Sequence, residues 1–356
     1  MSRTDPSPTD DWNPSWFHQR MVRPFTANPY PTLAEGLHMM WRFVIGGSKA
    51  NPEGLRFLPR QVQLNRITPQ STLGFTGDAM SMWGKPLRFD RGVVDFFAPC
   101  DHVILNFEGV ITDHAQYAPD QKHTRPVLDS LAQLAPKDKL VLSMANNHTA
   151  DYGEAECRRC LKLLEREGFT HFGVIDTPFI DLSPQVRITT GTQWSNRKGP
   201  HLAWLDGVER HVRPGAFNVL FPHCGYELEL FPRPSMVALM RSWLGHFDAV
   251  LGHHSHNPQP ITAETDASGV RKLAAYSLGN LAFGMAYRHV PGLSQLTLGA
   301  IARVTIGPLV DRPDQWAIGD LTWSFVECSP LPKKAGFETR LVEHCKFFAP
   351  ELIPSA

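Results

Sequence analysis

Short apolar segments that end in polar residues alternate with helical patterns from residue 71 onward. Three such segments, 73–78, 102–109 and 139–144, are separated by segments with helical periodicity at 92–98 and 127–134. This alternating order is typical of parallel strands that are joined by right-handed helical crossovers. The sequence therefore predicts an α/β fold around a mostly parallel central sheet.

The polar residues at the ends of these segments are of the kinds that bind metal ions. In open α/β sheets, ligands bind beyond the carboxyl ends of the strands. Later apolar segments at 217–223, 247–251 and 273–280 continue the pattern, and a helix is predicted at 234–246. The polar residues at five strand ends are Asp78, Glu108, Asn147, His148, His223, His254 and His256. We expect these side chains to meet at one edge of the sheet.

A histidine-rich turn follows the predicted strand 247–251. In the turn, His254 and His256 alternate along the chain, so an extended backbone would place both imidazoles on one side. Neutral imidazole is the commonest protein ligand for transition metals. A solvated polar loop is the alternative, but the other polar strand ends favour a metal site.

A further helix is predicted from about residue 151 to residue 168. Asp151 and Glu154 fit the two positions of a capping box, so we interpret Asp151 as a structural residue that caps this helix. Cys157 and Cys160 form a C-x-x-C motif inside the helix, but no second pair follows, which disfavours a zinc or redox site.

These motifs resemble the calcineurin-like metallophosphoesterase superfamily, and in particular its bacterial capsule-synthesis (CapA, or poly-gamma-glutamate biosynthesis) branch. The resemblance covers about residues 71–285, and its motifs are G-D at 77–78, N-F-E at 106–108, A-N-N-H-T-A-D-Y-G at 145–153, H-C-G-Y-E at 223–227, G-H-H-S-H at 252–256 and Y-S-L-G-N at 276–280. The resemblance implies a four-layer α/β/β/α sandwich of the metallophosphoesterase type with a metal centre at one edge.

The resemblance also implies roles for the strand-end residues. It assigns six ligands to two divalent ions, Mn, Fe or Zn: Asp78 and His256 to one ion, Asn147, His223 and His254 to the other, and Glu108 to both. Two such ions can hold a bridging hydroxide as the nucleophile and polarise a phosphoryl oxygen. His148 resembles the family's histidine that contacts the leaving group, where it can act as the catalytic acid.

Two features depart from the wider superfamily. That superfamily usually has D-x-H at the first strand, whereas Asp78 is followed by Ala79 and Met80. Its bridging residue is usually Asp, whereas the capsule branch and this chain have Glu, at Glu108. We therefore expect the metal site of Asp78 and His256 to bind its ion more weakly, to be less selective among metals, or to bind an ion only when substrate is present.

Five further residues are candidates for contacting the substrate or supporting the metal ligands: Asn106, Arg125, Glu227, His253 and Asn280. A guanidinium group at Arg125 can bind a carboxylate or phosphate with two hydrogen bonds. Glu227 follows His223 closely enough to face the site, or it lies in a solvated turn. The polar segment Asn196, Arg197 and Lys198 is expected to be solvated.

The chain is predicted to contain an N-terminal tail and helical extension at 1–70, a CapA-like metallophosphoesterase domain at 71–330 and a C-terminal tail at 331–356. Residues 1–11 are expected to be a frayed tail, and the apolar segment 37–45 a helix on the main domain, since a membrane span needs roughly 20 apolar residues. Two late segments, 304–306 and 321–326, are expected to be strands that complete the second sheet.

Charge and cysteine content restrict the setting. The chain has 35 Lys and Arg residues and 35 Asp and Glu residues, so no overall field attracts nucleic acid or an anionic membrane. Six cysteines are scattered through a chain that is too long to need disulfides, which indicates reduced thiols and a cytoplasmic location. We expect neither a nucleic-acid partner nor a membrane partner.

Three functions are compatible with these features. The first is a metal-dependent hydrolase that cleaves a phosphoester in a small-molecule or oligomeric anionic substrate. The second is a CapA-type enzyme that forms or cleaves an amide bond in a glutamyl or peptide-like substrate. The third is a non-catalytic, metal-binding assembly partner, which the presence of His148 disfavours.

Overall fold

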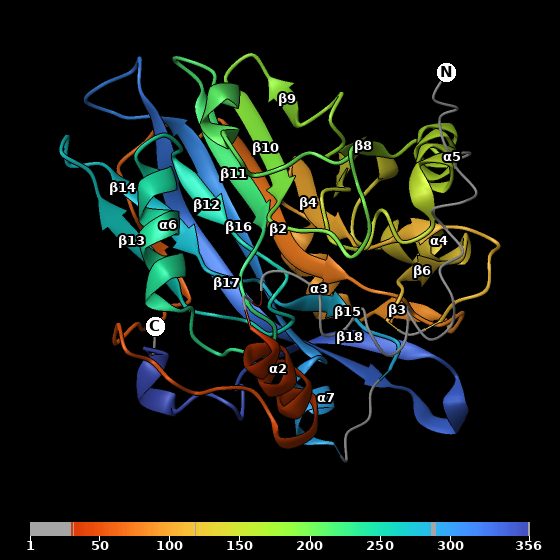
Figure 1. Ribbon diagram of the computed structural model, residues 1–356. Helices are drawn as coiled ribbons and strands as arrows, with labels where there is room; N and C mark the ends of the chain where they lie inside the picture. The colour runs from red at the N-terminus through yellow and green to blue at the C-terminus, as the bar shows by residue number, and fades with distance from the viewer. Residues whose placement is uncertain (1–29, 31, 118, 286–289, 355–356) are drawn as a thin grey trace, which may run out of the picture.

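The computed structural model describes residues 30, 32–117, 119–285 and 290–354 (Figure 1). This part of the chain is mixed α/β, with a ten-stranded, a six-stranded and a two-stranded sheet. The predicted α/β class is confirmed, and both large sheets combine parallel with antiparallel pairs. The expected frayed tail at 1–11 lies outside the described residues.

The larger sheet is built around the parallel strands that the sequence predicts. Its strands are β1 (Gln61–Gln63), β2 (Ser71–Ala79), β3 (Leu87–Phe89), β4 (His102–Phe107), β7 (Leu140–Ser143), β8 (Thr170–Phe172), β15 (Asn280–Ala282), β16 (Leu298–Pro308), β17 (Trp316–Pro330) and β18 (Phe337–Val342). Strands β2, β4, β7 and β8 are parallel neighbours. The predicted crossover helices are α3 (Arg91–Phe97) and α4 (Pro126–Leu131).

The six-stranded sheet is also parallel at its centre. Its strands are β9 (Phe179–Ser183), β10 (Val186–Thr192), β11 (Phe217–His223), β12 (Ala249–Leu251), β13 (Ile261–Thr265) and β14 (Arg271–Ala275). Strands β10, β11, β12 and β14 run parallel, and β9 and β13 pair antiparallel at the two edges. The predicted helix between β11 and β12 is α6 (Pro234–Leu244).

The remaining elements are short or lie at the margins. They are the two-stranded sheet of β5 (Val110–Ile111) and β6 (Lys122–His123), the helices α2 (Leu33–Ile45), α5 (Gly153–Arg166) and α7 (Pro291–Gln295), and the 3-10 turns η2 (Lys137–Lys139), η3 (Val208–His211), η4 (Pro332–Lys334) and η5 (Pro350–Leu352). Helix α2 confirms the helix that was predicted at 37–45. It begins earlier because the Thr32 hydroxyl accepts a hydrogen bond from the Glu35 N–H.

Alternating side chains of the larger sheet enter two different cores. Ile104 of β4 and Val141 of β7 join a core that also contains Phe221 of β11, so the two large sheets share it. Leu105 and Leu142, one position further along the same strands, join the second core with apolar residues of α3, α4 and α5. This alternation is the period of two that a strand buried on both faces requires.

The expectation that 304–306 and 321–326 complete the second sheet is wrong. These segments lie in β16 and β17, which belong to the larger sheet. Strand β16 pairs antiparallel with β2, along the edge of β2 opposite β4. Strand β18 extends the same sheet beside β17, so part of the segment expected to be a C-terminal tail is a strand. The apolar patterns of these segments predict strands but carry no information about their partners.

The predicted strand 273–280 is two strands in different sheets. Strand β14 ends at Ala275 in the six-stranded sheet, and β15 begins at Asn280 beside β2 in the larger one. The chain turns at Gly279, whose φ of 61° is readily adopted by glycine. A Cβ atom at Gly77 would lie 1.8 Å from the Gly279 carbonyl oxygen, so β2 can approach this turn only with glycine there.

Candidate metal centre

Strand ends from both large sheets meet at one buried cluster. In the larger sheet, Asp78 of β2 is in register with Asn106 of β4 on one side and with Asn280 of β15 on the other. In the smaller sheet, His223 ends β11 and forms an isolated bridge with His253. All five side chains are buried. The ends of neighbouring strands thus bring together residues that are far apart in the sequence.

The Asp78 carboxylate is surrounded by donors. Its Oδ1 accepts a hydrogen bond of 2.7 Å from Asn106 Nδ2 and lies 3.0 Å from His253 Nδ1. Its Oδ2 accepts a hydrogen bond of 3.0 Å from the His254 main-chain N–H and lies 3.4 Å from His256 Nδ1. Burial opposes ionisation, but hydrogen bonds and charge from His253 and His256 hold the pKa of Asp78 well below its usual range. Asp78 therefore favours its ionised form, and its two oxygens face nitrogen atoms of His253, His254 and His256.

The Glu108 carboxylate has the opposite environment. It follows β4, it is completely buried, and among the described residues neither oxygen has a hydrogen-bond partner. Its Oε1 lies 3.8 Å from His148 Nε2 and 3.8 Å from His256 Nε2. Burial, followed by the negative charge of Asp78, raises the pKa of Glu108 to about 8. A buried carboxylate without hydrogen bonds is costly unless a cation compensates it.

His223, at the end of β11, and His254, after β12, have the environment of neutral ligands. His223 Nε2 lies 2.7 Å from Asn147 Oδ1, and neither ring nitrogen of His254 has a hydrogen-bond partner among the described residues. Burial lowers the pKa of His223 and of His254 well below the usual range, and the charges of neighbouring histidines act in the same direction. Neutral imidazoles have the lone pair that a metal ion needs.

The histidine-rich turn has a strained backbone. His254 and His256 have φ angles of 94° and 58°, a region that non-glycine residues seldom adopt. The turn is not the extended segment that the sequence predicts, yet both imidazoles reach the same cluster. His256 Nδ1 lies 3.1 Å from Asn280 Oδ1. Such strain is frequent where a turn must aim ligands at one point.

The ligand atoms fall into small groups that fit metal ions. Within each group, all atoms lie within 4.8 Å of one another, and the groups are Asp78, Glu108 and His256; Glu108, His223 and His254; Asp78, His223 and His253; and Glu227, His254 and His256. The first two groups share Glu108. Its carboxylate without hydrogen bonds therefore lies between two sets of nitrogen and oxygen donors, which is chemically suited to divalent transition metals.

His148 and Asp151 form a hydrogen-bonded pair beside this cluster. His148 Nδ1 lies 2.6 Å from Asp151 Oδ2, while His148 Nε2 is directed toward Glu108. The interpretation of Asp151 as a helix cap is wrong. Helix α5 begins at Gly153, which has a φ of 79°, and its N-cap position is Tyr152. The Asp151 carboxylate instead accepts a hydrogen bond from the Gln121 main-chain N–H.

Sequence patterns missed two contributors from loops. Asn196, which was expected to be solvated, has its Nδ2 3.0 Å from His148 Nδ1, and its main-chain N–H donates to the Asn147 carbonyl. The expectation was also wrong for Arg197, whose side chain is 9% exposed, whereas Lys198 is exposed. No periodicity marks this loop, so only the tertiary fold reveals its position.

Asn146 is the second missed contributor. Its Nδ2 donates hydrogen bonds to Asn106 Oδ1 and to the Phe107 carbonyl, and its Oδ1 accepts from the His148 main-chain N–H. It therefore fixes the neighbouring strand end in place. Its position next to Asn147 in the A-N-N-H motif was the available signal.

The five supporting candidates are placed differently. Asn106, His253 and Asn280 contact Asp78 or His256, and Glu227 belongs to a ligand group with His254 and His256. Arg125 is not brought to the cluster. Its guanidinium binds Glu167 at the surface, with Nε 2.9 Å from Oε1, and its side chain is 65% exposed.

The fold and site define an α/β protein with a buried His/Asp/Glu cluster whose donor set is consistent with metal binding. Residues 72–187 and 192–285 match the family model described as "Bacterial capsule synthesis protein PGA_cap". The chain therefore belongs to the PGA_cap family, a metallophosphoesterase-like family.

Two further comparisons add little. No curated protein matches the chain. One similar solved structure is the crystal structure of a hypothetical protein from Thermus thermophilus, with 15% sequence identity, a TM-score of 0.39, and coverage of 70% of this chain and 98% of that chain. At this TM-score the likeness carries no conclusion about fold or function.

None of the helices in the described part of the chain combines the length and the apolarity that a membrane span requires.

Proposed function

We propose that the protein is a metal-dependent hydrolase that cleaves a phosphoester at two adjacent divalent ions. The observation that carries this proposal is the buried Glu108 carboxylate, which has no hydrogen-bond partner among the described residues and belongs to two ligand groups. When bound, two divalent ions would activate a water molecule and polarise a phosphoryl oxygen. Mn, Fe and Zn all suit the nitrogen and oxygen donors present.

The proposed ligand roles follow the two groups that share Glu108. Asp78 and His256 would hold one ion, Asn147, His223 and His254 would hold the other, and Glu108 would contact both. Asn280 would orient His256 through the 3.1 Å contact with its Nδ1, which leaves Nε2 for the ion. The substrate would be a small-molecule or oligomeric anion.

His148 is proposed to donate the proton to the departing oxygen. Asp151 contacts Nδ1 of its ring, which leaves Nε2 on the side of the cluster. A carboxylate in this position selects the tautomer with the proton on Nδ1 in the neutral ring and stabilises the charged ring. With both nitrogens protonated, Nε2 can serve as the acid.

The packing of the two cores supports a four-layer α/β/β/α arrangement, which we include in the proposal. The first core joins the two large sheets and extends to residues of α6, and the second joins the larger sheet to α3, α4 and α5. A cytoplasmic setting stays a prediction from the sequence. The six cysteines are free and buried in the structure.

The test combines metal content with turnover. Protein purified without chelator would be analysed for its elements and assayed with p-nitrophenyl phosphate. We expect about two ions per chain and turnover that Glu108→Gln lowers by more than about 100-fold, because a ligand matters more than the groups that support one. Glu351→Gln, at an exposed position, is the matched control. One ion or none, with no turnover after each metal is added, would contradict the proposal.

A second candidate is amide chemistry on a glutamyl substrate. The family description, which names capsule synthesis, favours it. A substrate panel that includes phosphoesters and glutamyl peptides separates the two reactions, since one releases phosphate and the other releases an amine. A non-catalytic assembly role predicts metal binding without either product, and the His148–Asp151 pair argues against it.

A further inference from the structure

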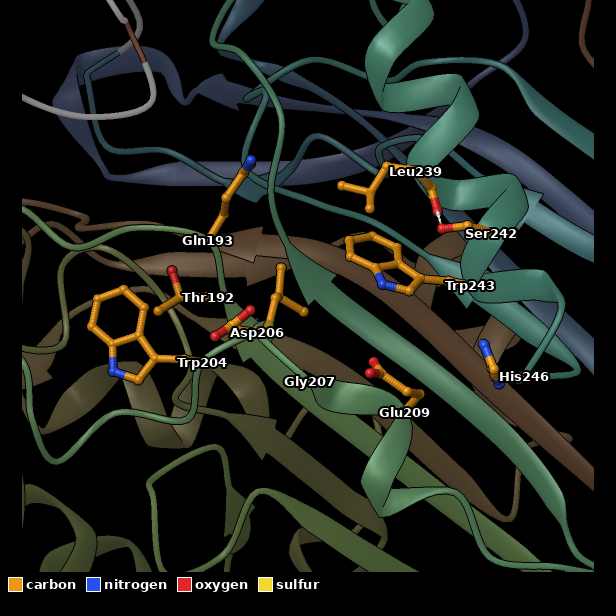
Figure 2. A pocket seen from close by; sticks show the side chains of 11 residues that line it. Thr192, Gln193, Trp204, Asp206, Gly207, Glu209, Leu239, Ser242, Trp243 and His246 are labelled. Atoms are coloured by element: carbon orange, nitrogen blue, oxygen red, sulfur yellow. Dashed lines mark hydrogen bonds between the residues drawn. The ribbon is translucent and has the colours of Figure 1, made fainter.

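A cavity lies next to the strand ends of the candidate metal centre. It has a volume of about 520 Å³ and is bounded by the end of β10, the segment 204–209 and helix α6 (Figure 2). This volume suits a small molecule. None of the candidate metal ligands is among the described residues that line it. The cavity is therefore a separate site, and what it binds goes beyond the proposed function.

Main-chain hydrogen bonds fix one wall of the cavity, and one face of helix α6 forms the opposite wall. The Thr192 N–H donates to the Ala203 carbonyl at 2.9 Å, and the Leu205 N–H donates to the Thr192 carbonyl at 3.1 Å, so the segment 203–205 lies along the end of β10. On the opposite side, positions 239, 242 and 243 of α6 all line the cavity. Their spacing places them on one face of the helix.

Two indole rings line the cavity, one from each side. Trp204 comes from the segment beside β10 and is 37% exposed, and Trp243 comes from α6 and is 7% exposed. Figure 2 shows Trp204 with Thr192 and Asp206 on the β10 side, and Trp243 with Leu239 and Ser242 on the α6 side. Indole faces attract cations, and of the aromatic rings indole does so most strongly.

The charges in the cavity are acidic. Asp206 and Glu209 line it, and no Lys or Arg does so among the described residues. Within the described chain neither carboxylate has an ion-pair partner within 4.0 Å. The nearby Arg210 donates instead to the Asp206 carbonyl oxygen at 3.0 Å. An anionic ligand would meet two carboxylates here, and His246 is the one titratable base among the described lining residues.

We propose that this cavity binds an organic cation, namely an ammonium group carried by a small molecule. The indoles supply the cation–π contact, and Asp206 and Glu209 supply the opposite charge. The segment 192–194 connects the cavity to the metal centre. Gln193 Oε1 accepts a hydrogen bond from the Gly225 N–H at 3.2 Å, and the Trp194 ring lies 5.1 Å from that of His254.

Choline is the probe for this proposal, and 3,3-dimethyl-1-butanol is its neutral counterpart of the same shape. Calorimetric titration of the full-length protein should detect choline binding at low salt and at least about tenfold weaker binding of the neutral alcohol. The double variant Asp206→Asn/Glu209→Gln should weaken choline binding by about tenfold or more. Asp314→Asn, at an exposed position in the turn between β16 and β17, is the control and should bind choline as the wild type does.

A second variant separates loss of binding from loss of folding. Trp204→Ala removes a partly exposed ring, and its folding is checked by circular dichroism and by the urea midpoint. A folded Trp204→Ala protein should bind choline more weakly. Equal binding of choline and the alcohol, or preferential binding of a neutral sugar such as cellobiose, would overturn the proposal. The same wild-type sample is also assayed with p-nitrophenyl phosphate. Turnover without choline binding contradicts this proposal alone, whereas choline binding without turnover contradicts the proposed function alone.

Discussion

Two carboxylates at neighbouring strand ends, Asp78 and Glu108, have opposite environments. Both are completely buried, yet Asp78 has donors around both oxygens whereas Glu108 has no hydrogen-bond partner among the described residues. The protein's own donors therefore bond to the Asp78 carboxylate, whereas the Glu108 carboxylate is left for a cation. The comparison indicates that Asp78 contributes to folding in addition to its proposed role as a ligand, whereas Glu108 contributes mainly to metal binding.

The largest expected effect is a difference in stability. Asp78→Asn should lower the free energy of unfolding of the metal-free protein by about 3–5 kcal/mol, because it removes the buried anion that His253 Nδ1, His256 Nδ1 and the Asn106 amide contact. Glu108→Gln should change it by less than Asp78→Asn does, since no hydrogen bond is lost and only the 3.8 Å charge contacts with His148 and His256 are removed. Urea titrations in the presence of chelator measure both. An equal loss of unfolding free energy in the two variants would contradict the difference proposed between Asp78 and Glu108.

The second effect concerns metal binding. Divalent ions should stabilise the wild type by about 2.7 kcal/mol at a concentration 100-fold above the dissociation constant, because they bind the folded state. The same concentration should give Glu108→Gln much less stabilisation, since the carboxylate shared by two ligand groups is gone. Thermal unfolding with Mn²⁺ or Zn²⁺, and again after dialysis against chelator, measures the difference. An unchanged shift in the variant would argue that Glu108 is not a ligand.

The third effect tests a supporting residue. Asn280→Ala should weaken metal binding by roughly 10–100-fold, because Asn280 Oδ1 holds the ring of His256 at 3.1 Å. Isothermal titration of metal-depleted protein gives the affinity. Asn65→Ala, which removes a part-buried asparagine that bonds to the Arg271 and Ile318 carbonyls, is a structural control. Similar affinities in the wild type and Asn280→Ala would remove Asn280 from the site.

The smallest effect extends the comparison to Asp248, which precedes β12 at the other end of the six-stranded sheet. Burial raises the pKa of Asp248 to about 6, although its carboxylate accepts a hydrogen bond from the Asn218 N–H. The ordinary value is about 3.9, so the folded state binds this proton more tightly than the unfolded state does. Stability should therefore fall as the pH rises from about 4 to about 6.

Asp248→Asn removes that dependence and keeps an oxygen for the Asn218 N–H. The variant should gain roughly 1–2 kcal/mol relative to the wild type between pH 4 and pH 6, because only the wild type loses the proton there. Urea titrations across this pH range measure the difference. Parallel pH profiles for the two proteins would show that Lys272, 3.9 Å away, already compensates the charge.

Sequence patterns predicted the parts of the fold that depend on local periodicity. Strand β11 occupies the predicted segment 217–223, and the carboxyl ends of predicted strands supply the residues of the buried cluster. The family assignment is confirmed by the match of the PGA_cap model. Parallel strands place their ends at one edge whatever the loops between them, so this level of prediction needs little tertiary information.

The patterns failed where distant partners decide the outcome. The apolar run from 273 to 280 gives no sign that the chain changes sheets at Gly279. Asp151 fits a capping box, but the helix begins only at Gly153. The Asp151 carboxylate forms a hydrogen bond with His148 instead. Asn196 reaches the same histidine from a loop without periodicity. A one-dimensional pattern records which faces are buried, and it leaves open which neighbours bury them.

The passage of the chain from one large sheet to the other, between Ala275 and Asn280, occurs beside the candidate metal ligands. The ligands therefore come from both sheets, and any sliding of one sheet over the other changes the distance between their donor atoms. That distance is set by the core between the sheets, where the ring centres of Phe75 and Phe221 lie 6.2 Å apart. Metal affinity should therefore depend on how the core between the sheets is packed. A substitution that opens a cavity around Phe221 should weaken binding of the ion.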